Sequence, residues 1–341
     1  MREYIARIMD SGDLSREEAR KAMDAIMGGG VSDALISAFL TALKIKKETI
    51  EEISGFSDAM LEKAKKVEVR GKRLVDTCGT GGDELGTFNI STTAAFIAAG
   101  AGVSIAKHGN RSVSSRSGSA DVLESSGVNI GLGPEAIARC IEKTGIGFIY
   151  ARMAHSAMKH AARVRQELGI KTVFNILGPL TNPAGASGRV LGVYDASLLE
   201  VMAGVLRNLG VDRAFIINCE NGMDELSTSA RSRVVCLEDG CMTGYVLDPA
   251  RLGFKKADIS ELMGGDAGQN AEIMRGILAG KISGPMRDTA VLNAAAAIIA
   301  GRLADRMEDG LRLAEDSIDE GRALDKLEKL IQVSNELAGG G

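Results

Sequence analysis

The chain has 341 residues with a formal net charge of −4, and 45% of the residues are hydrophobic while 25% are charged. This is the composition of a globular protein large enough for a full hydrophobic core, and it excludes a disordered chain. The acidic balance argues against nucleic acid as the main partner, because neutralising phosphates requires a basic face.

The cysteines and apolar runs indicate the compartment. The five cysteines are scattered and form no C-x-x-C pair, so we expect reduced thiols and neither a disulfide framework nor a zinc site. The chain opens without the basic-then-apolar pattern of a signal peptide. Its longest apolar run, Ala294–Ala300, is too short to span a bilayer. We therefore expect a cytoplasmic protein that does not bind membranes.

Residues 1–66 show helical patterns only. Ser15 with Glu18, and Thr49 with Glu52, are capping boxes that each open an amphipathic helix. No strand pattern interrupts this stretch. It predicts a small helical domain that packs on the rest of the chain or on a second copy of it.

From residue 67 onwards, short apolar runs alternate with helical stretches. This alternation predicts an α/β domain with a mainly parallel central sheet, whose ligands bind in loops at the carboxyl ends of the strands. The predicted strands are Leu74–Thr77, Val103–Ala106, Ile146–Tyr150, Val190–Val193, Ala214–Ile217 and Val234–Leu237. The predicted helices are Ser91–Ala99, Ala120–Leu123, Pro134–Lys143, Ser156–Leu168, Leu198–Leu209 and Thr289–Arg302.

The loop Asp76–Asp83 follows the first predicted strand. Its three glycines, Gly79, Gly81 and Gly82, let backbone N–H groups point into one small space, an arrangement that binds anionic oxygens. The spacing fits neither a Walker loop nor a dinucleotide fingerprint. A plain glycine-rich turn is the alternative.

Two further loops also favour phosphate. Residues 87–93 place several small polar side chains at a helix start, where free N–H groups and the helix dipole attract anions, although simple capping is the alternative. Residues 107–119 carry one Lys, two Arg, one His, five Ser, one Asn and two Gly. That mixture predicts an anion-binding loop, with a solvated disordered loop as the alternative. We expect His108 to line a pocket rather than act as a general base.

Three other features complete the sequence pattern. Asp224 and Glu225 follow a predicted strand and suggest Mg²⁺ coordination, which two carboxylates and phosphate oxygens can provide, although a solvated surface pair is the alternative. Arg163 or Arg165 could hold a substrate carboxylate through two hydrogen bonds, or could be surface charge. The apolar run Phe174–Pro183, which contains two prolines, predicts a rigid corner or hinge.

Together these segments resemble the anthranilate phosphoribosyltransferase family. They occur in that family's order with similar spacing, and the resemblance spans essentially the whole chain. It is specific because several motifs must occur together. The segments are DTCGTGGD at Asp76–Asp83, NIST at Asn89–Thr92, KHGNRSVSS at Lys107–Ser115, GSADVLE at Gly118–Glu124, TVFNILGPLTNPA at Thr172–Ala184, and Asp224-Glu225.

The resemblance implies a magnesium-dependent glycosyltransferase of tryptophan biosynthesis. Such an enzyme moves the phosphoribosyl group of phosphoribosyl pyrophosphate (PRPP) onto the amine of anthranilate and releases pyrophosphate. The resemblance also implies a small all-helical domain over residues 1–66, joined by a helical segment near residues 160–185, and an α/β phosphoribosyl-binding domain over residues 67–341. The protein would be a homodimer formed through the small domain.

The resemblance also implies a role for each site residue. Lys107, Asp224 and Glu225 would be catalytic, and Mg²⁺ would be held by Ser91, Asp224 and Glu225. Arg165 is preferred over Arg163 because it directly precedes the Gln-Glu-Leu-Gly stretch. The residues that would line the anthranilate site are Gly79, His108, Asn110 and Arg165. Those that would contact PRPP are Gly79, Gly82, Asp83, Thr87, Asn89, Ile90, Ser91, Thr92, Lys107, His108, Gly109, Asn110, Arg111, Ser112, Val113, Ser114, Ser115 and Ser119.

Two other functions are compatible with parts of this pattern. Pyrimidine nucleoside phosphorylases share a Lys-His-Gly loop and a similar layout, but the paired Asp224-Glu225 favours the pyrophosphate donor. A catalytically inactive, nucleic-acid-binding relative would need degraded loops and a basic surface, whereas these loops are complete and the chain is acidic.

Overall fold

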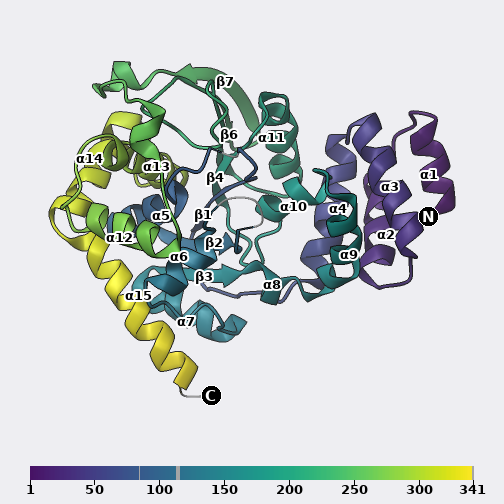
Figure 1. Cartoon of the computed structure of the whole chain (residues 1–341), viewed down its shortest axis with the longest axis horizontal. Coiled ribbons are helices and arrows are strands. Elements are labelled where there is room, and N and C mark those ends of the chain that lie inside the picture. Colours follow the sequence, from purple (N-terminus) through teal and green to yellow (C-terminus); the bar gives the residue numbers. More distant parts are fainter. Residues whose placement is uncertain (84, 113–115, 340–341) are drawn as a thin grey trace.

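The computed structural model describes residues 1–83, 85–112 and 116–339, and it shows a helical unit beside a larger α/β unit (Figure 1). The amino terminus lies at the outer side of the helical unit, and α15 runs along the α/β unit to its lower edge in this view. Within the described residues, no helix combines the length and apolarity needed to cross a membrane.

The helical unit begins with four helices that follow one another in the sequence. Both predicted capping boxes form: Ser15 with Glu18 opens α2, and Thr49 with Glu52 opens α4. Later segments return to this unit, because α9 packs on α2 and α3, and α10 packs on α4. The helices are α1 (Arg2–Met9), α2 (Arg16–Met27), α3 (Asp33–Lys46), α4 (Ile50–Lys63), α8 (Ala151–Ala154), α9 (Lys159–Leu168) and α10 (Phe174–Leu180).

A single seven-stranded sheet forms the centre of the α/β unit, in the order β3-β2-β1-β4-β5-β6-β7. The first five strands in this order are parallel, and β6 and β7 join by antiparallel pairing. The predicted fold class, a helical domain plus a mainly parallel α/β domain, is therefore confirmed. The strands are β1 (Leu74–Gly79), β2 (Ser104–Gly109), β3 (Ile146–Tyr150), β4 (Gly188–Gly192), β5 (Arg213–Cys219), β6 (Ser232–Glu238) and β7 (Cys241–Leu247).

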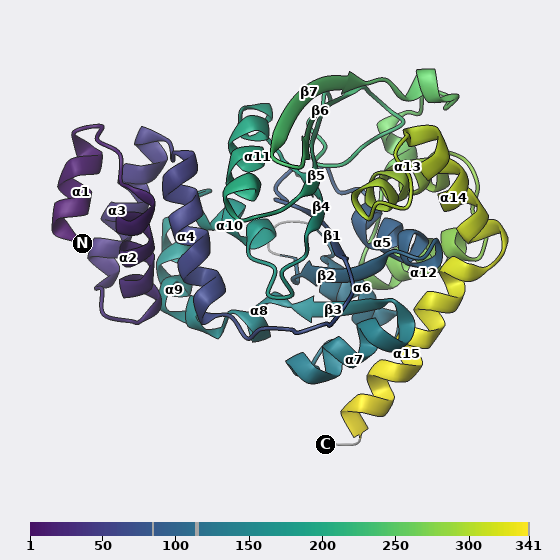
Figure 2. The same cartoon turned by 180° about the vertical axis from the view of Figure 1, so that it is seen from behind.

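The two faces of the sheet pack against different hydrophobic cores. Along β5, Phe215 and Ile217 face the core that contains α5 and α13, whereas Ala214 and Ile216 face α11 and the helical unit. Figure 2 shows α11 on one side of the sheet and α5, α12, α13 and α14 on the other. These helices are α5 (Ile90–Gly100), α6 (Ser119–Ser125), α7 (Pro134–Thr144), α11 (Leu199–Asn208), α12 (Ala267–Leu278), α13 (Pro285–Ala300), α14 (Met307–Asp319) and α15 (Arg322–Gly339).

The sequence predictions did not include helices α12, α14 and α15, and three further elements differ from them. The predicted helix over residues 156–168 is a 3₁₀ turn, η1 (Ser156–Met158), followed by α9. The run predicted as a rigid corner begins with helix α10, which ends one residue after Pro179, so only the stretch from Thr181 onwards forms the corner. Strand β7 was not predicted: its sequence CMTGYVL is largely apolar, but the apolar residues do not alternate with polar ones, and most of the strand is exposed in the structure. The remaining 3₁₀ turns are η2 (Ala196–Leu198), η3 (Pro249–Leu252) and η4 (Ile259–Leu262).

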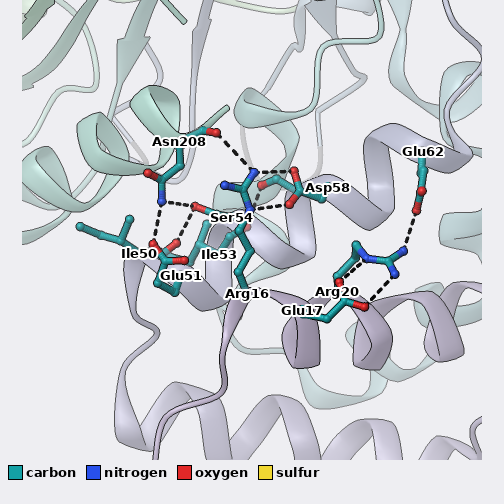
Figure 3. Close-up of polar contacts among 11 residues, drawn as sticks. Arg16, Glu17, Arg20, Ile50, Glu51, Ile53, Ser54, Asp58, Glu62 and Asn208 are labelled. Carbon is teal, nitrogen blue, oxygen red and sulfur yellow. Dashed lines mark hydrogen bonds and ion pairs between the residues drawn. The ribbon is translucent and has the colours of Figure 1, made fainter. Parts of the chain in front are cut away.

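Polar contacts attach α11 to the helical unit. Asn208 at the end of α11 points toward α4 (Figure 3), and its Nδ2 donates to Glu51 Oε1 at 2.9 Å and to Ser54 Oγ at 3.2 Å. Arg16 of α2 donates to the Asn208 carbonyl oxygen at 3.3 Å and pairs with Asp58 at 2.6 Å. Because α11 also packs on β5 and β6, it connects the helical unit to the sheet.

Candidate active site

The order of the strands places the site. The chain runs from β1 through α5 to its neighbour β2, but it reaches β4, on the other side of β1, only after β3. Such a reversal of strand order opens a crevice at the carboxyl ends of the strands, where parallel sheets bind ligands. The loops that follow β1 and β5, the start of α5 and the end of β2 meet at this place.

The glycine loop after β1 lies against Asp224. The Gly81 N–H donates to Asp224 Oδ2 at 2.8 Å. A Cβ atom on Gly79 would lie 2.3 Å from the same oxygen, so only glycine allows this approach. Gly81 and Gly82 have φ values of 65° and 81°, a region that glycine occupies readily and other residues avoid. The loop therefore presents backbone N–H groups beside a carboxylate.

Of the two adjacent carboxylates, Asp224 is buried and Glu225 is partly buried. The Ser91 N–H donates to Glu225 Oε1 at 3.2 Å, which links the pair to the start of α5. Burial, and then the charge of Asp83, raise the pKa of Asp224 to about 7. Burial, and then the charge of Asp224, raise the pKa of Glu225 to about 8. Concentrated negative charge of this kind is stabilised by a cation.

The residues present fit Mg²⁺. Mg²⁺ is usually held by one or two carboxylates together with water and phosphate oxygens of a substrate. Asp224 and Glu225 supply two carboxylates whose pKa values are raised first by burial and then by the negative charge of neighbouring carboxylates. Within the part of the chain that the structure describes, no group of three or more His, Cys, Asp or Glu side chains is placed to hold a metal. An ion at this site would therefore complete its coordination with hydroxyl, water or phosphate oxygens.

Lys107 at the end of β2 is buried and points toward the other loops. Its Nζ donates to the Thr77 carbonyl oxygen at 2.6 Å and to Ser91 Oγ at 3.4 Å. Burial lowers the pKa of Lys107, although the carboxylates nearby act in the opposite direction. This ammonium group lies between the β1 end and the α5 start.

His108 is buried next to Lys107. Its ring lies 5.2 Å from the His155 ring, measured between centroids. Burial lowers the pKa of His108 well below the usual range, so the ring is neutral near pH 7. Its Nε2 has no hydrogen-bond partner among the residues that the structure describes. A neutral ring suits the predicted role of lining a pocket.

The start of α5 presents Asn89, Ile90, Ser91 and Thr92. Asn89 makes no capping bond to the helix. Instead its Nδ2 donates to the Ser117 carbonyl oxygen at 3.3 Å, and its Oδ1 accepts from Asn270 Nδ2 at 2.9 Å. Ile90 is buried, and Thr92 Oγ1 is buried with no partner in the described ranges. Polar groups in addition to the backbone N–H groups are therefore gathered here.

The loop after β2 is held by carboxylates of α6. Arg111 pairs with Asp121 at 2.9 Å and with Glu124 at 2.8 Å, so these acids already balance its charge. The Ser112 N–H donates to Asp121 Oδ2 at 3.0 Å. The Asn110 carbonyl oxygen accepts from Ser119 Oγ at 3.4 Å. A Cβ atom on Gly109 would meet Ser119 Oγ at 2.1 Å. The predicted PRPP residues Val113, Ser114 and Ser115 lie outside the described residues.

The two candidate arginines differ in environment. Arg163 has a side chain that is 76% exposed and pairs with Glu167 at 2.8 Å. Arg165 is half-buried, its guanidinium carbon lies 5.3 Å from the centre of the Phe174 ring, and burial lowers its pKa. It forms no hydrogen bond or ion pair with any described residue. Arg165 therefore keeps its donors available for a carboxylate, and Arg163 does not.

Two site contacts had no signal in the sequence. Lys171 lies before α10, yet its Nζ donates to the Gly82 carbonyl oxygen at 2.7 Å and lies 4.4 Å from the centre of the Tyr194 ring. Asn270 of α12 donates to Asn89.

Thr87 and Asp83 are the remaining predicted PRPP residues near the glycine loop, and together they form the rim of the site. Thr87 forms an isolated bridge with Met263, and Asp83 Oδ1 accepts from the Leu85 N–H at 3.3 Å.

Comparisons of sequence agree over nearly the whole chain. Residues 2–64 match the helical bundle domain of a glycosyl transferase family, and residues 71–324 match its a/b domain. An anthranilate phosphoribosyltransferase of Acetivibrio thermocellus is 50% identical over 335 residues, which cover 98% of this chain and 97% of that protein. One of Syntrophobacter fumaroxidans is 51% identical over 332 residues, 97% of this chain and 98% of that protein.

Comparisons of structure give the same family. The crystal structure of anthranilate phosphoribosyltransferase from Thermus thermophilus matches with a TM-score of 0.93 and 41% identity, covering 97% of this chain and 99% of that one. The Saccharomyces cerevisiae protein in complex with PRPP and Mg matches with a TM-score of 0.90 and 28% identity, covering 98% and 97%. Since the sequence motifs, the fold and the relatives all agree over nearly full length, this chain belongs to the anthranilate phosphoribosyltransferase family of pentosyltransferases.

Proposed function

We propose that this chain transfers the phosphoribosyl group of PRPP to the amine of anthranilate, with Mg²⁺ and with release of pyrophosphate, as a step of tryptophan biosynthesis. The observation that carries the proposal is the meeting of the glycine loop, the start of α5 and the carboxylates Asp224 and Glu225 at one end of the sheet. N–H donors and a cation-binding pair in one place suit a sugar that bears several phosphates.

The reaction separates charge, and the charged and polar groups of the site can stabilise the separated charges. The bond from the anomeric carbon to pyrophosphate breaks with its electron pair leaving on pyrophosphate. The amine nitrogen forms the new bond to that carbon and then loses a proton to solvent. When bound, Mg²⁺ neutralises the departing pyrophosphate, and Asp224, Glu225 and the Ser91 hydroxyl would hold it. Preorganised donors in a buried site stabilise such charge far better than water does.

The chain's own donors would bind PRPP. The Gly82 amide of the glycine loop, the start of α5 and the Lys107 ammonium would supply N–H groups toward the phosphates. Lys107 already lies between Thr77 and Ser91, so it needs little rearrangement. The donor-binding residues are those of the glycine loop and rim (Gly79, Gly82, Asp83, Thr87), the α5 start (Asn89 to Thr92) and the loop from Lys107 to Ser115 with Ser119.

Anthranilate would lie between the two units. Arg165, with its unpaired guanidinium, would bind the carboxylate, and Gly79, His108 and Asn110 would line the remainder of the site. An aromatic amine is a neutral nucleophile near neutral pH, so no strong base is required. Holding it in line with the anomeric carbon turns a two-body encounter into one near-attack geometry. In the cell, the protein would act in the cytoplasm as a homodimer formed through residues 1–66.

Loss of anthranilate fluorescence tests the activity. Purified protein is mixed with anthranilate, PRPP and Mg²⁺, and fluorescence is expected to fall only when all are present. A second mixture with a pyrimidine nucleoside and phosphate tests the phosphorylase alternative. Turnover of the nucleoside, or no loss of anthranilate fluorescence with active PRPP, contradicts the proposal.

A further inference from the structure

Asp76 is a fully buried carboxylate in the middle of β1, and it contacts three other segments of the chain. Its Oδ1 accepts from the His108 N–H at 3.0 Å. Its Oδ2 accepts from Asn182 Nδ2 at 2.8 Å and from Arg189 Nη1 at 2.9 Å. Asp76 is 0% exposed and Arg189 is 4% exposed. Both carboxylate oxygens are therefore used by the protein itself.

The Asp76 carboxylate lies where the backbone pairing between β1 and β2 ends. β1 pairs with β2 only at Leu74↔Ser104 and Val75↔Ile105, whereas its pairing with β4 continues to Gly79↔Gly192. Beyond Val75 the two strands are no longer paired through their backbones. Asp76 then takes the His108 N–H, and Asn182 Nδ2 donates to the Ala106 carbonyl oxygen at 2.7 Å. These two side chains satisfy backbone groups of β2 that a continued ladder would have paired.

The end of the β1–β2 backbone pairing leaves Thr77 free to bind the Lys107 side chain. The Lys107 side chain reaches back to the Thr77 carbonyl oxygen and Thr77 Oγ1, both on β1. If β1 and β2 stayed paired to their ends, the Thr77 backbone would be engaged by the ladder. The position of the ammonium group thus depends on the end of the β1–β2 backbone pairing, where Asp76 and Asn182 bond to β2 instead.

The same carboxylate fixes the corner after α10. Asn182 lies in that corner, and its Oδ1 accepts from the Ala184 N–H at 2.9 Å. Arg189 Nη1 also lies 3.5 Å from the Pro179 carbonyl oxygen in α10. Helix α10 carries Phe174, on which Arg165 rests. One side chain therefore touches the segments that carry Lys107, His108 and the support of Arg165.

We propose that Asp76 is a positioning residue: its carboxylate sets the distance between the PRPP-binding end of β2 and the corner that supports the anthranilate side. It contacts neither substrate. A buried ion pair is weak evidence for stability, because desolvation offsets much of its attraction and apolar replacements are often as stable. Its contacts instead lead to the segment that carries Lys107 and His108, and to the corner and β4, which adjoin the α10 helix that supports Arg165. The inference rests on the proposed function for its kinetic readout.

The test compares Asp76→Asn with Asp212→Asn. An asparagine side chain has one acceptor oxygen in place of two. Either the His108 N–H, or the donors of Arg189 and Asn182, therefore lose their acceptor. Asp212 also holds an arginine in two bonds, to Arg73 at 2.7 and 2.6 Å, but at the opposite ends of β1 and β5. Asp76→Asn is expected to lower kcat per folded molecule by about 10- to 100-fold and to raise the KM for anthranilate. Asp212→Asn is expected to change neither.

Hydrogen exchange gives a readout that does not depend on turnover. Without substrates, the amides of residues 104–109 should exchange faster in Asp76→Asn than in the unmodified protein or in Asp212→Asn. If the unmodified protein fails to consume anthranilate, the proposed function fails, while the exchange comparison still decides the role of Asp76.

A double variant keeps the test decisive if Asp76→Asn does not fold. Asp76→Leu combined with Arg189→Met removes both charges and leaves no buried unpaired charge, so folding is expected even though the His108 N–H loses its acceptor. A folded double variant with low kcat and fast exchange at residues 104–109 supports the proposal. Unchanged kcat and exchange in this variant, or an effect of Asp76→Asn on melting temperature alone, overturns it.

Discussion

Ionising both Asp224 and Glu225 is unfavourable, because the two carboxyl groups are adjacent, Asp224 is buried and Glu225 is partly buried. Their pKa values of about 7 and about 8 lie above the values near 4 of unfolded carboxyl groups. The folded chain without a cation therefore holds more protons than the unfolded chain between about pH 4 and 8. Proton binding and cation binding compete for the same oxygens.

This competition predicts a pH dependence. The stability that these groups contribute is fully present below about pH 4 and is lost as the pH rises through about 7 to 8. We expect Glu225→Gln, relative to the unmodified protein, to become progressively more stable as the pH rises from 5 to 8.5 without divalent cations. Thermal unfolding at each pH measures the difference. A difference that stays constant across this range would contradict the raised pKa values.

Removing one carboxylate should reduce catalysis strongly. Losing a well-placed charge-stabilising group typically lowers turnover about 100- to 1,000-fold, and we expect Asp224→Ala to fall in this range. Initial rates at saturating PRPP and anthranilate, over a series of Mg²⁺ concentrations, measure it. Turnover close to that of the unmodified protein would remove Asp224 from the metal site.

The contrast between the two arginines gives a matched pair of variants. Arg165→Ala should raise the KM for anthranilate more than the KM for PRPP. The half-buried guanidinium has no partner in the described chain, so its removal is expected to cost chiefly the bond to the anthranilate carboxylate. Arg163→Ala should leave both KM values unchanged, since that side chain is 76% exposed and pairs only with acidic surface residues. Equal increases in both KM values for Arg165→Ala would count against carboxylate recognition.

At the scale of elements, the end of β4 determines where the carboxylates lie. A Cβ atom on Gly192 would lie 1.4 Å from the Asp224 carbonyl oxygen, so the two backbones touch. The Thr80 N–H also donates to the Gly192 carbonyl oxygen at 2.9 Å. The glycine loop and the carboxylate turn thus pack against the same residue of β4.

Gly192→Ala should therefore displace the Asp224 turn. We expect turnover to fall about 100-fold and stability to fall by about 1–3 kcal/mol, as for other overpacked sites. Gly244→Ala in β7 is the control, because a Cβ atom there would meet nothing within 4 Å. Rates and denaturant unfolding of both variants measure the effects. If Gly192→Ala keeps full activity, the close contact does not position Asp224.

Local patterns explain which elements could be predicted. The capping boxes at Ser15 and Thr49 and the apolar strands carry their signal within a few residues. The Asp239-Gly240 turn, with φ values of 48° and 86°, fits a two-residue hairpin and could have indicated β7. The site motifs also lie within short segments. What no local pattern reveals is pairing between distant residues, such as Lys171 with Gly82 or Asp76 with Asn182.

At the scale of the whole molecule, α11 connects the helical unit to the sheet through Asn208. Asn208→Ala loses the bonds to Glu51 and Ser54 and should destabilise the protein by about 0.5–1.5 kcal/mol. Hydrogen exchange should become faster in α4. Asn335→Ala is the matched control, since it loses bonds to Gly127 and Ile331 within the α/β unit alone. Equal exchange of α4 in both variants would contradict this role for Asn208.

The return of α9 and α10 to the first four helices affects how the protein is made. Helices α2 and α3 need α9 to cover their apolar surface, but α9 ends at Leu168, far along the chain. A ribosome adds about 5–20 residues per second, so the emerging helices wait on the order of several seconds for their partner. During that interval the part of their apolar surface that α9 covers faces solvent. A nascent chain of this protein is therefore expected to expose apolar helix surface until α9 has been made.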